Sequence, residues 1–203
     1  MKIYDFTFAP NPRRVRMFLA EKGIKVPYEQ VDIMAGKNRT PEFLKKNPMG
    51  GLPVLELDDG AFLSESVAIC RYFEGTHPEP VLMGADTRDR AFVEMWNRRM
   101  ELDIFGPIAR AFQNTTELFK GRMQQFPDYG KAQRETAIQR LGWLDGELKS
   151  RKFIAGERLT IADITAFVGI ELGRTMGGLV IPPEMKNVHR WLEEMSARPS
   201  AKA

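Results

Sequence analysis

Residues 47–66 read NPMGGLPVLELDDGAFLSES and combine a turn, a hairpin and the start of a helix. Residues 54–57 and 61–63 flank Asp58-Asp59-Gly60, a turn signal that predicts two antiparallel strands. Ser64-Glu65-Ser66 then opens an apolar pattern with helical spacing, formed by Val67, Ile69, Cys70 and Phe73. The stretch therefore predicts β-β-α, the closing half of a small α/β domain.

The residues before this stretch predict a β-α-β-α beginning. Residues 2–6 read as a short strand, and a helix is expected to begin at Pro12, because proline suits a first helical turn. Residues 26–32 alternate as a second strand, and residues 40–46 resemble a capped helix. Residues 1–77 are thus predicted to form one α/β domain in the order β-α-β-α-β-β-α.

The pattern changes after residue 77. Residues 78–88 contain prolines and a glycine and are interpreted as a linker. Residues 89–120, 131–149, 160–173 and 184–197 all show helical periodicity, and no strand pattern returns. An all-α C-terminal domain is therefore expected over residues 89–203.

Composition limits the function classes. The 203 residues are 43% hydrophobic and 28% charged, which is typical of a globular protein. The net charge of +3 comes from scattered basic residues, which argues against a nucleic-acid or membrane-surface partner. No apolar run approaches the roughly 18 residues of a membrane span, and no apolar signal stretch follows Met1, so a cytoplasmic protein is expected.

The single cysteine restricts thiol chemistry. Cys70 excludes an internal disulfide and any CxxC site, so a reacting thiol must come from outside the chain. His77 and His189 are far apart and lack metal-ligand spacing, so no metal site is expected.

Four motifs, in this order along the chain, resemble the signatures of cytosolic glutathione transferases: residues 10–16, 47–55, 64–69 and 153–163. Residues 191–200 resemble the last long helix of that family, so the resemblance covers nearly the whole chain. The segment after the first strand is similar to a bacterial type with an asparagine-containing loop. The resemblance implies a thioredoxin-like N-terminal domain that binds glutathione, an all-helical C-terminal domain and a homodimer.

Glutathione carries two carboxylates, an ammonium and a thiol, and residues 50–66 offer matching groups. The helix that starts at Ser66 presents free N–H groups and the positive end of its dipole to the γ-glutamyl carboxylate, while Glu65 accepts from the ammonium. In the family the bond equivalent to Leu52-Pro53 is cis, and Leu52 pairs with the cysteinyl unit like a strand. The resemblance also implies that Asp103 reaches the glutathione amine of the partner subunit.

Purely structural explanations of these residues stay open. Ser64 can be an ordinary N-cap with Glu65 favouring the helix dipole, and Pro53 can simply open a strand.

Two positions depart from the family pattern. Ala9 stands where many members have a hydroxyl that holds the glutathione thiolate, so Asn11 is the predicted catalytic donor, with Thr7 or a backbone N–H as the next candidates. Gly51 stands where relatives often have a lysine for the glycyl carboxylate. Arg39, or its neighbours Asn38 and Lys37, is expected to replace that lysine.

The second substrate is expected to be an apolar electrophile, bound between the domains by Phe8, Phe105, Ile108 and Phe112. The leading function is a glutathione transferase that conjugates this electrophile or reduces disulfides or peroxides with glutathione. The alternative is a non-catalytic glutathione-binding or scaffold protein on the same fold, because folds host several functions and Ala9 lacks a donor. A glutathione-dependent isomerase would be expected to show a serine-rich loop, which Pro10-Asn11-Pro12 lacks.

Overall fold

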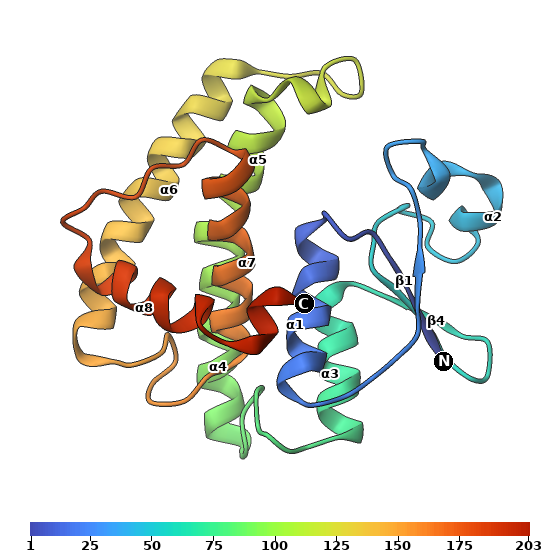
Figure 1. The fold of residues 1–203 in the computed structure, drawn as a ribbon, viewed down its shortest axis with the longest axis horizontal. Helices are drawn as coiled ribbons and strands as arrows, with labels where there is room; N and C mark the ends of the chain where they lie inside the picture. Colours follow the sequence, from blue (N-terminus) through green and yellow to red (C-terminus); the bar gives the residue numbers. More distant parts are fainter. The chain divides into compact units, whose positions relative to one another are not determined.

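The computed structural model describes residues 1–203 and divides into two compact units (Figure 1). The first unit comprises Met1–Val81 together with Pro199–Ala203, and the second comprises Leu82–Arg198. The division falls inside residues 78–88, which the sequence marks as a linker.

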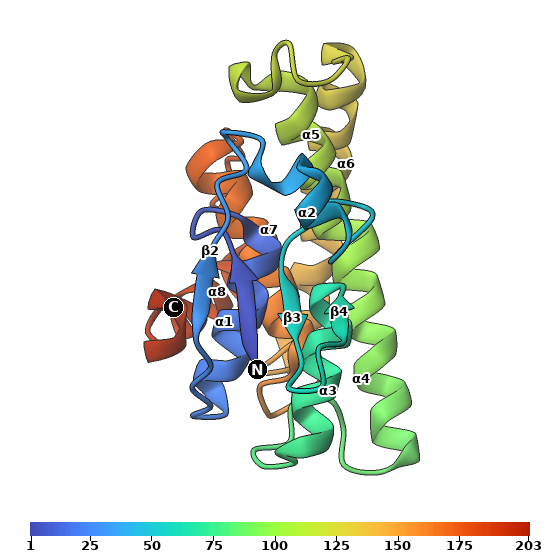
Figure 2. The same ribbon diagram turned by 90° about the vertical axis from the view of Figure 1, so that its right-hand side faces the viewer.

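The first unit has the predicted order β-α-β-α-β-β-α. Its elements are β1 (Lys2–Asp5), α1 (Pro10–Glu21), β2 (Tyr28–Gln30), the 3-10 turn η1 (Lys37–Arg39), α2 (Pro41–Leu44), β3 (Val54–Glu56), β4 (Phe62–Ser64) and α3 (Ser66–Thr76). The strands form one sheet in the order β2-β1-β3-β4, with β1 parallel to β2 and the other neighbours antiparallel. Figure 2 shows this sheet with α1 and α3 behind it. The prediction of an α/β first domain is confirmed.

The register of β1 and β3 separates two cores. Tyr4 pairs with Val54 and Ile3 with Leu55. Because neighbouring side chains on a strand point to opposite faces, Tyr4 and Val54 pack with Phe43 of α2, while Ile3 and Leu55 are buried on the other face.

Helix α1 begins two residues earlier than predicted. Ala9 is the N-cap in an extended conformation, and Pro10 and Pro12 both lie in the first turn. Prolines are tolerated there because the first N–H groups of a helix have no intrahelical partner. The predicted start at Pro12 is therefore wrong, and Asn11 belongs to the helix instead of the loop before it.

Two further boundaries differ from the prediction. Strand β2 covers only residues 28–30 of the expected 26–32, because those three residues alone are in register with β1. The 3-10 helix η5 (Pro199–Lys202) packs on α1 instead of extending the helical unit. Arg13 Nη2 donates to the carbonyl oxygen of Ala201 at 2.8 Å, and the Ser200 hydroxyl donates to Glu21.

The second unit is entirely helical, as predicted. Its elements are α4 (Thr87–Arg99), the π-helical segment η2 (Met100–Phe105), α5 (Gly106–Thr115), η3 (Glu117–Phe119), α6 (Pro127–Glu147), η4 (Leu148–Ser150), α7 (Ile161–Met176) and α8 (Lys186–Ser196). None of these or the other helices combines the length and the apolar character that a membrane span requires.

Helix α7 forms the centre of the helical unit, and twelve of its sixteen residues are buried. It packs against α4, η2 and α5. Two glycines make this close approach feasible: a Cβ on Gly169 would lie 2.8 Å from Cβ of Phe105, and one on Gly173 would lie 2.9 Å from Ile108. The close packing of the unit therefore depends on the glycines of α7 as well as on apolar side chains.

The start of α7 is fixed by the buried carboxylate of Asp163. It accepts hydrogen bonds from the backbone N–H of Ile154 at 2.8 Å, from the backbone N–H of Thr160 at 2.9 Å and from the indole of Trp191 at 3.0 Å. Burial raises the pKa of Asp163, although these hydrogen bonds favour the charged form. Thr160 and Asp163 form a capping box, and the same carboxylate also holds the 154 loop and α8.

Replacing Asp163 with alanine is expected to destabilise the protein by about 3 kcal/mol or more, because it removes a cap and leaves buried donors without acceptors. Asp86, the exposed N-cap of α4, is the matched control: it accepts from the Asp89 N–H at 2.9 Å, and Asp86→Ala is expected to cost about 1 kcal/mol. Urea unfolding followed by circular dichroism measures both. Equal losses for the two variants would contradict a special role for the buried cap.

Candidate functional site

Three chain segments of the first unit carry its predicted site: the start of α1, the residues before β3 and the start of α3. The Leu52-Pro53 bond is cis, as the family resemblance implies. Pro53 is buried, and the half-buried Leu52 packs on the cluster of Tyr4, Phe43 and Val54. The pairing of Leu52 with a ligand stays a prediction.

The N-terminus of α3 is open and uncapped. Glu65 is the N-cap with φ of 69°, and it is the one non-glycine residue with positive φ. Such backbone conformations persist at a cost and cluster at functional sites. No side chain caps the helix, and its first internal bond is that of the Ile69 N–H to the Glu65 carbonyl at 3.0 Å. The N–H groups of residues 66–68 are therefore not used inside the helix.

The identity of the N-cap of α3 tests the structural explanation of Ser64. Ser64 is the last residue of β4 and does not cap α3. The interpretation of Ser64 as an ordinary N-cap is therefore wrong. The exposed carboxylate of Glu65 is instead available at the helix start.

Ser66 is held from below by an arginine. Arg14 Nη1 donates to Ser66 Oγ at 2.6 Å, and both residues are buried, with 1% of Arg14 and 5% of Ser66 exposed. A serine hydroxyl has one donor hydrogen, and a guanidinium has no acceptor. The hydroxyl hydrogen of Ser66 must therefore point away from Arg14.

The same arginine nitrogen orients Asn11. Arg14 Nη1 donates to Asn11 Oδ1 at 3.2 Å, so the carboxamide oxygen faces the arginine and the NH2 group faces away from it. Asn11 is exposed, and its NH2 group is a free donor in the first turn of α1. The predicted fallback, Thr7, donates its hydroxyl hydrogen to Gln30 Oε1 at 3.0 Å, so that hydrogen is already engaged.

Arg14 is the site residue that sequence reasoning missed. It lies four residues before Phe18 and one before Val15, so it occupies the buried stripe of α1. A charged residue within an apolar helical stripe was the available signal, because charged side chains are rarely buried without partners. What the sequence did not reveal is that its partners are Asn11 and Ser66.

The loop around Gly50 is held by residues of η1. Asn38 Nδ2 donates to the carbonyl oxygen of Gly50 at 2.7 Å, and Arg39 Nη1 donates to that of Met49 at 3.0 Å. Gly50 has φ of 65°, and a Cβ there would lie 2.8 Å from Arg39 Nη1. The guanidinium of Arg39 is thus next to Gly50, the residue before Gly51, and its carboxylate-binding role stays a prediction.

The predicted electrophile residues differ in exposure. Phe8 of the first unit is 77% exposed. In the helical unit, Phe105, Ile108 and Phe112 are buried: the first two pack on the glycines of α7, and Phe112 makes an edge contact with Phe119. Their role in binding an electrophile stays a prediction.

Asp103 lies in η2 of the helical unit. One of its carboxylate oxygens is 3.9 Å from Arg140 Nη2, and its side chain is 45% exposed. This contact is a long surface ion pair, which typically contributes little to stability. The role of Asp103 at a partner's glutathione stays a prediction.

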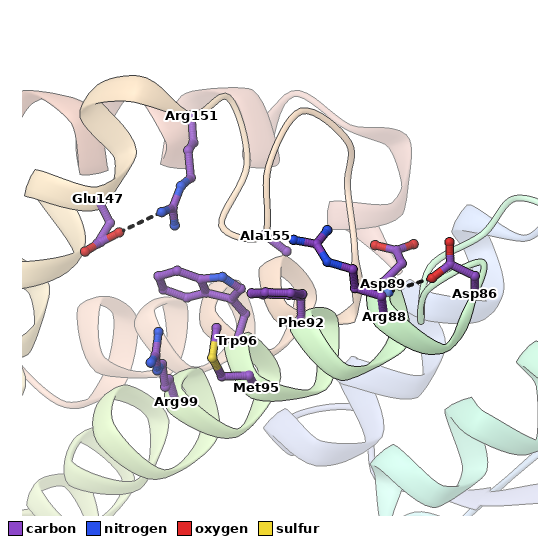
Figure 3. A pocket seen from close by; sticks show the side chains of 10 residues that line it. All are labelled: Asp86, Arg88, Asp89, Phe92, Met95, Trp96, Arg99, Glu147, Arg151 and Ala155. Carbon is purple, nitrogen blue, oxygen red and sulfur yellow. Dashed lines mark hydrogen bonds and ion pairs between the residues drawn. The ribbon is translucent and has the colours of Figure 1, made fainter.

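A separate cavity of about 570 Å³ lies in the helical unit (Figure 3). Its arginines are stacked on aromatic rings: Arg88 on Phe92 at 4.8 Å, and Arg99 and Arg151 on Trp96 at 4.9 and 4.7 Å. Cation–π contacts of this kind stabilise the guanidinium groups without neutralising them.

The acidic residues of this cavity are engaged locally. Glu147 pairs with Arg151 at 3.0 Å, Asp89 accepts from the Ala85 N–H and pairs with Arg158, and Asp86 caps α4. The contacts with Ala85 and Arg158 hold the pKa of Asp89 below its usual range, and the backbone hydrogen bond from Ala85 contributes most. None of the predicted site residues lines the cavity, so it is distinct from the site in the first unit.

The internal thiol and the acidic residues do not form a second reactive centre. Cys70 is fully buried, and burial raises the pKa of its thiol to about 12, so it stays protonated and unreactive at neutral pH. No cluster of three or more histidine, cysteine, aspartate or glutamate side chains suited to a metal ion is found.

Two family models together match most of the chain. Residues 3–81 match the glutathione S-transferase N-terminal domain, and residues 91–199 match the glutathione S-transferase C-terminal domain.

Individual relatives match along the full length. Glutathione S-transferase 2 of Saccharomyces cerevisiae is 34% identical over 206 residues, covering 100% of this chain and 88% of the relative. A solved glutathione S-transferase domain-containing protein from Marinobacter aquaeolei VT8 is 39% identical with a TM-score of 0.94, covering 98% of this chain and 99% of the other. The crystal structure of Gtt2 from Saccharomyces cerevisiae is 34% identical with a TM-score of 0.93, covering 100% and 99%.

Proposed function

Because the chain belongs to the glutathione S-transferase family over both of its units, we propose that it binds glutathione at the start of α3 and holds the glutathione thiolate beside Asn11. Its activity is that of a glutathione transferase. The thiol loses its proton to solvent, the thiolate forms a C–S bond with an apolar electrophile, and the leaving group departs with the displaced electron pair.

The observation that carries this proposal is the arrangement at the N-terminus of α3. Uncapped N–H groups, the positive end of the helix dipole and the outward hydroxyl of Ser66 suit the γ-glutamyl carboxylate. The exposed Glu65 beside them suits the ammonium. A site for an anion and a site for a cation therefore lie at adjacent residues, which matches the zwitterionic end of glutathione.

We assign the binding of the other groups of glutathione to neighbouring residues. Leu52, before cis-Pro53, pairs with the cysteinyl backbone, and Arg39 beside Gly50 takes the glycyl carboxylate. Phe8, Phe105, Ile108 and Phe112 are assigned to binding of the apolar electrophile. Reduction of disulfides or peroxides by the same thiolate belongs to this proposal as a side activity.

Glu65→Gln and Ser66→Ala are each expected to weaken glutathione binding about ten-fold or more. The reason is that a hydrogen bond to a charged group contributes about 1.5–3 kcal/mol. Isothermal titration calorimetry with reduced glutathione measures the effect. Ser64→Ala, which removes a hydroxyl outside the first turn of α3, is the matched control and is expected to bind like wild type. Unchanged binding in both site variants would sink the assignment.

The role of Asn11 concerns the thiol. A free cysteine thiol has a pKa near about 8.5, and lowering it by two requires about 2.7 kcal/mol of preferential stabilisation of the thiolate. The free NH2 group of Asn11 and the N-terminus of α1 supply a donor and a favourable dipole, while Pro10 and Pro12 provide no N–H. Both contributions together match the required size.

Asn11→Ala is therefore expected to raise the pKa of the bound thiol and to lower turnover about ten-fold or more, while glutathione affinity changes only a few-fold. The thiolate absorbance at about 240 nm, followed against pH with bound glutathione, measures that pKa. Thr7→Val is the control, because the Thr7 hydroxyl is engaged with Gln30. A raised thiol pKa in Thr7→Val with no change in Asn11→Ala would reverse the assignment.

A non-catalytic binding protein on the same fold is the competing function, and Ala9 is the residue that favours it. A glutathione-affinity column followed by a chloro-dinitrobenzene assay and a disulfide-reduction assay separates the two. Retention on the column with turnover supports the transferase, and retention without turnover supports the binding protein.

The assembly and location follow the family. We expect a cytoplasmic homodimer in which Asp103 approaches the glutathione of the partner subunit. Light scattering at micromolar concentration is expected to give twice the mass of one chain. A species with the mass of a single chain at every concentration would rule out the dimer.

A further inference from the structure

We propose that Arg14 is a positioning residue that sets the donor direction at two groups of the bound glutathione, at the thiol through Asn11 and at the γ-glutamyl carboxylate through Ser66. This inference rests on the glutathione site proposed above. Arg14 itself is buried beneath that site and acts through its two neighbours.

The geometry places one nitrogen between two acceptors. Arg14 Nη1 carries two hydrogens and donates to Ser66 Oγ at 2.6 Å and to Asn11 Oδ1 at 3.2 Å. Ser66 opens α3 and Asn11 lies in the first turn of α1, so a single group bonds to the starts of both helices.

The chemistry of the guanidinium makes this contact directional. An asparagine carboxamide can rotate by about 180° and exchange its donor and acceptor ends, and a serine hydroxyl can donate in several directions. A guanidinium donates only, so neither side chain can satisfy it by donating. Both must present an acceptor to Arg14 and therefore a donor to the opposite side, where the proposed ligand lies.

Arg14 also fits this role better than a role in packing alone. An apolar side chain in the buried stripe of α1 would fill space beside Val15 and Phe18 without a desolvation cost. It would leave Asn11 and Ser66 free to turn their donors inward.

Arg14→Met is expected to weaken glutathione binding about ten-fold or more and to raise the pKa of the bound thiol by about one or more, since both donors lose their orientation. Arg14→Lys keeps the charge without the planar fork and is expected to fall between Arg14→Met and wild type. Arg13→Lys is the matched control: it changes the adjacent arginine, which donates to Ala201, and is expected to leave both quantities unchanged.

Double-mutant cycles separate positioning from a merely structural role. If Arg14 acts through Asn11, adding Asn11→Ala to an Arg14 variant raises the thiol pKa little further, and adding Ser66→Ala weakens binding little further. Additive effects in both cycles, or an unchanged thiol pKa and affinity in the Arg14 variants, would overturn the inference. If Arg14→Met does not fold, the cycles with Arg14→Lys decide.

The wild-type protein separates this inference from the proposed function. If wild type binds glutathione but the effects in the Arg14 double-mutant cycles are additive, only the positioning role is overturned. Wild type that does not bind glutathione overturns both.

Discussion

The hydrogen bond from buried Arg14 to Ser66, 2.6 Å long, is the constraint that links the segments of the proposed site in the first unit. A guanidinium in the interior is tolerated only with acceptors, and Arg14 finds them at the starts of α1 and α3. These two helices also pack against each other on one face of the sheet. One buried charge therefore links the two helix N-termini at which glutathione binding is proposed.

The sheet carries this arrangement. The pairing of β1 with β3 places Ile3 and Leu55 on one face and Tyr4 and Val54 on the other. A shift of one residue would exchange the two faces, because the side-chain period of a strand is two. The starts of α1 and α3 follow β1 and β4 in the chain, so the sheet register also limits where the site residues lie.

The helical unit shows a similar use of a buried charge. The Asp163 carboxylate accepts from the 154 loop, from the start of α7 and from Trp191 of α8. In both units a charged side chain is stabilised by groups from several segments, and each such side chain fixes the position of a helix start. The difference is that Asp163 is wholly structural, whereas the partners of Arg14 face a proposed ligand.

Local signals in the sequence, turn chemistry and periodicity, predict the order of elements and the hairpin around Gly60. Glu65, Ser66 and Asn11 are candidates because the motifs that contain them resemble those of the family and because a helix start suits an anion.

Long-range packing places the start of α1 at Pro10, gives Glu65 a positive φ at the N-cap of α3 with no side-chain capping bond, and seats the last residues on α1. Folding also determined that Arg14 is buried, because an arginine in an apolar stripe can be buried or can extend its charge to solvent, and the sequence does not distinguish them. The partners that keep it buried are Asn11, three residues away, and Ser66, which is fifty-two residues away and brought near by folding.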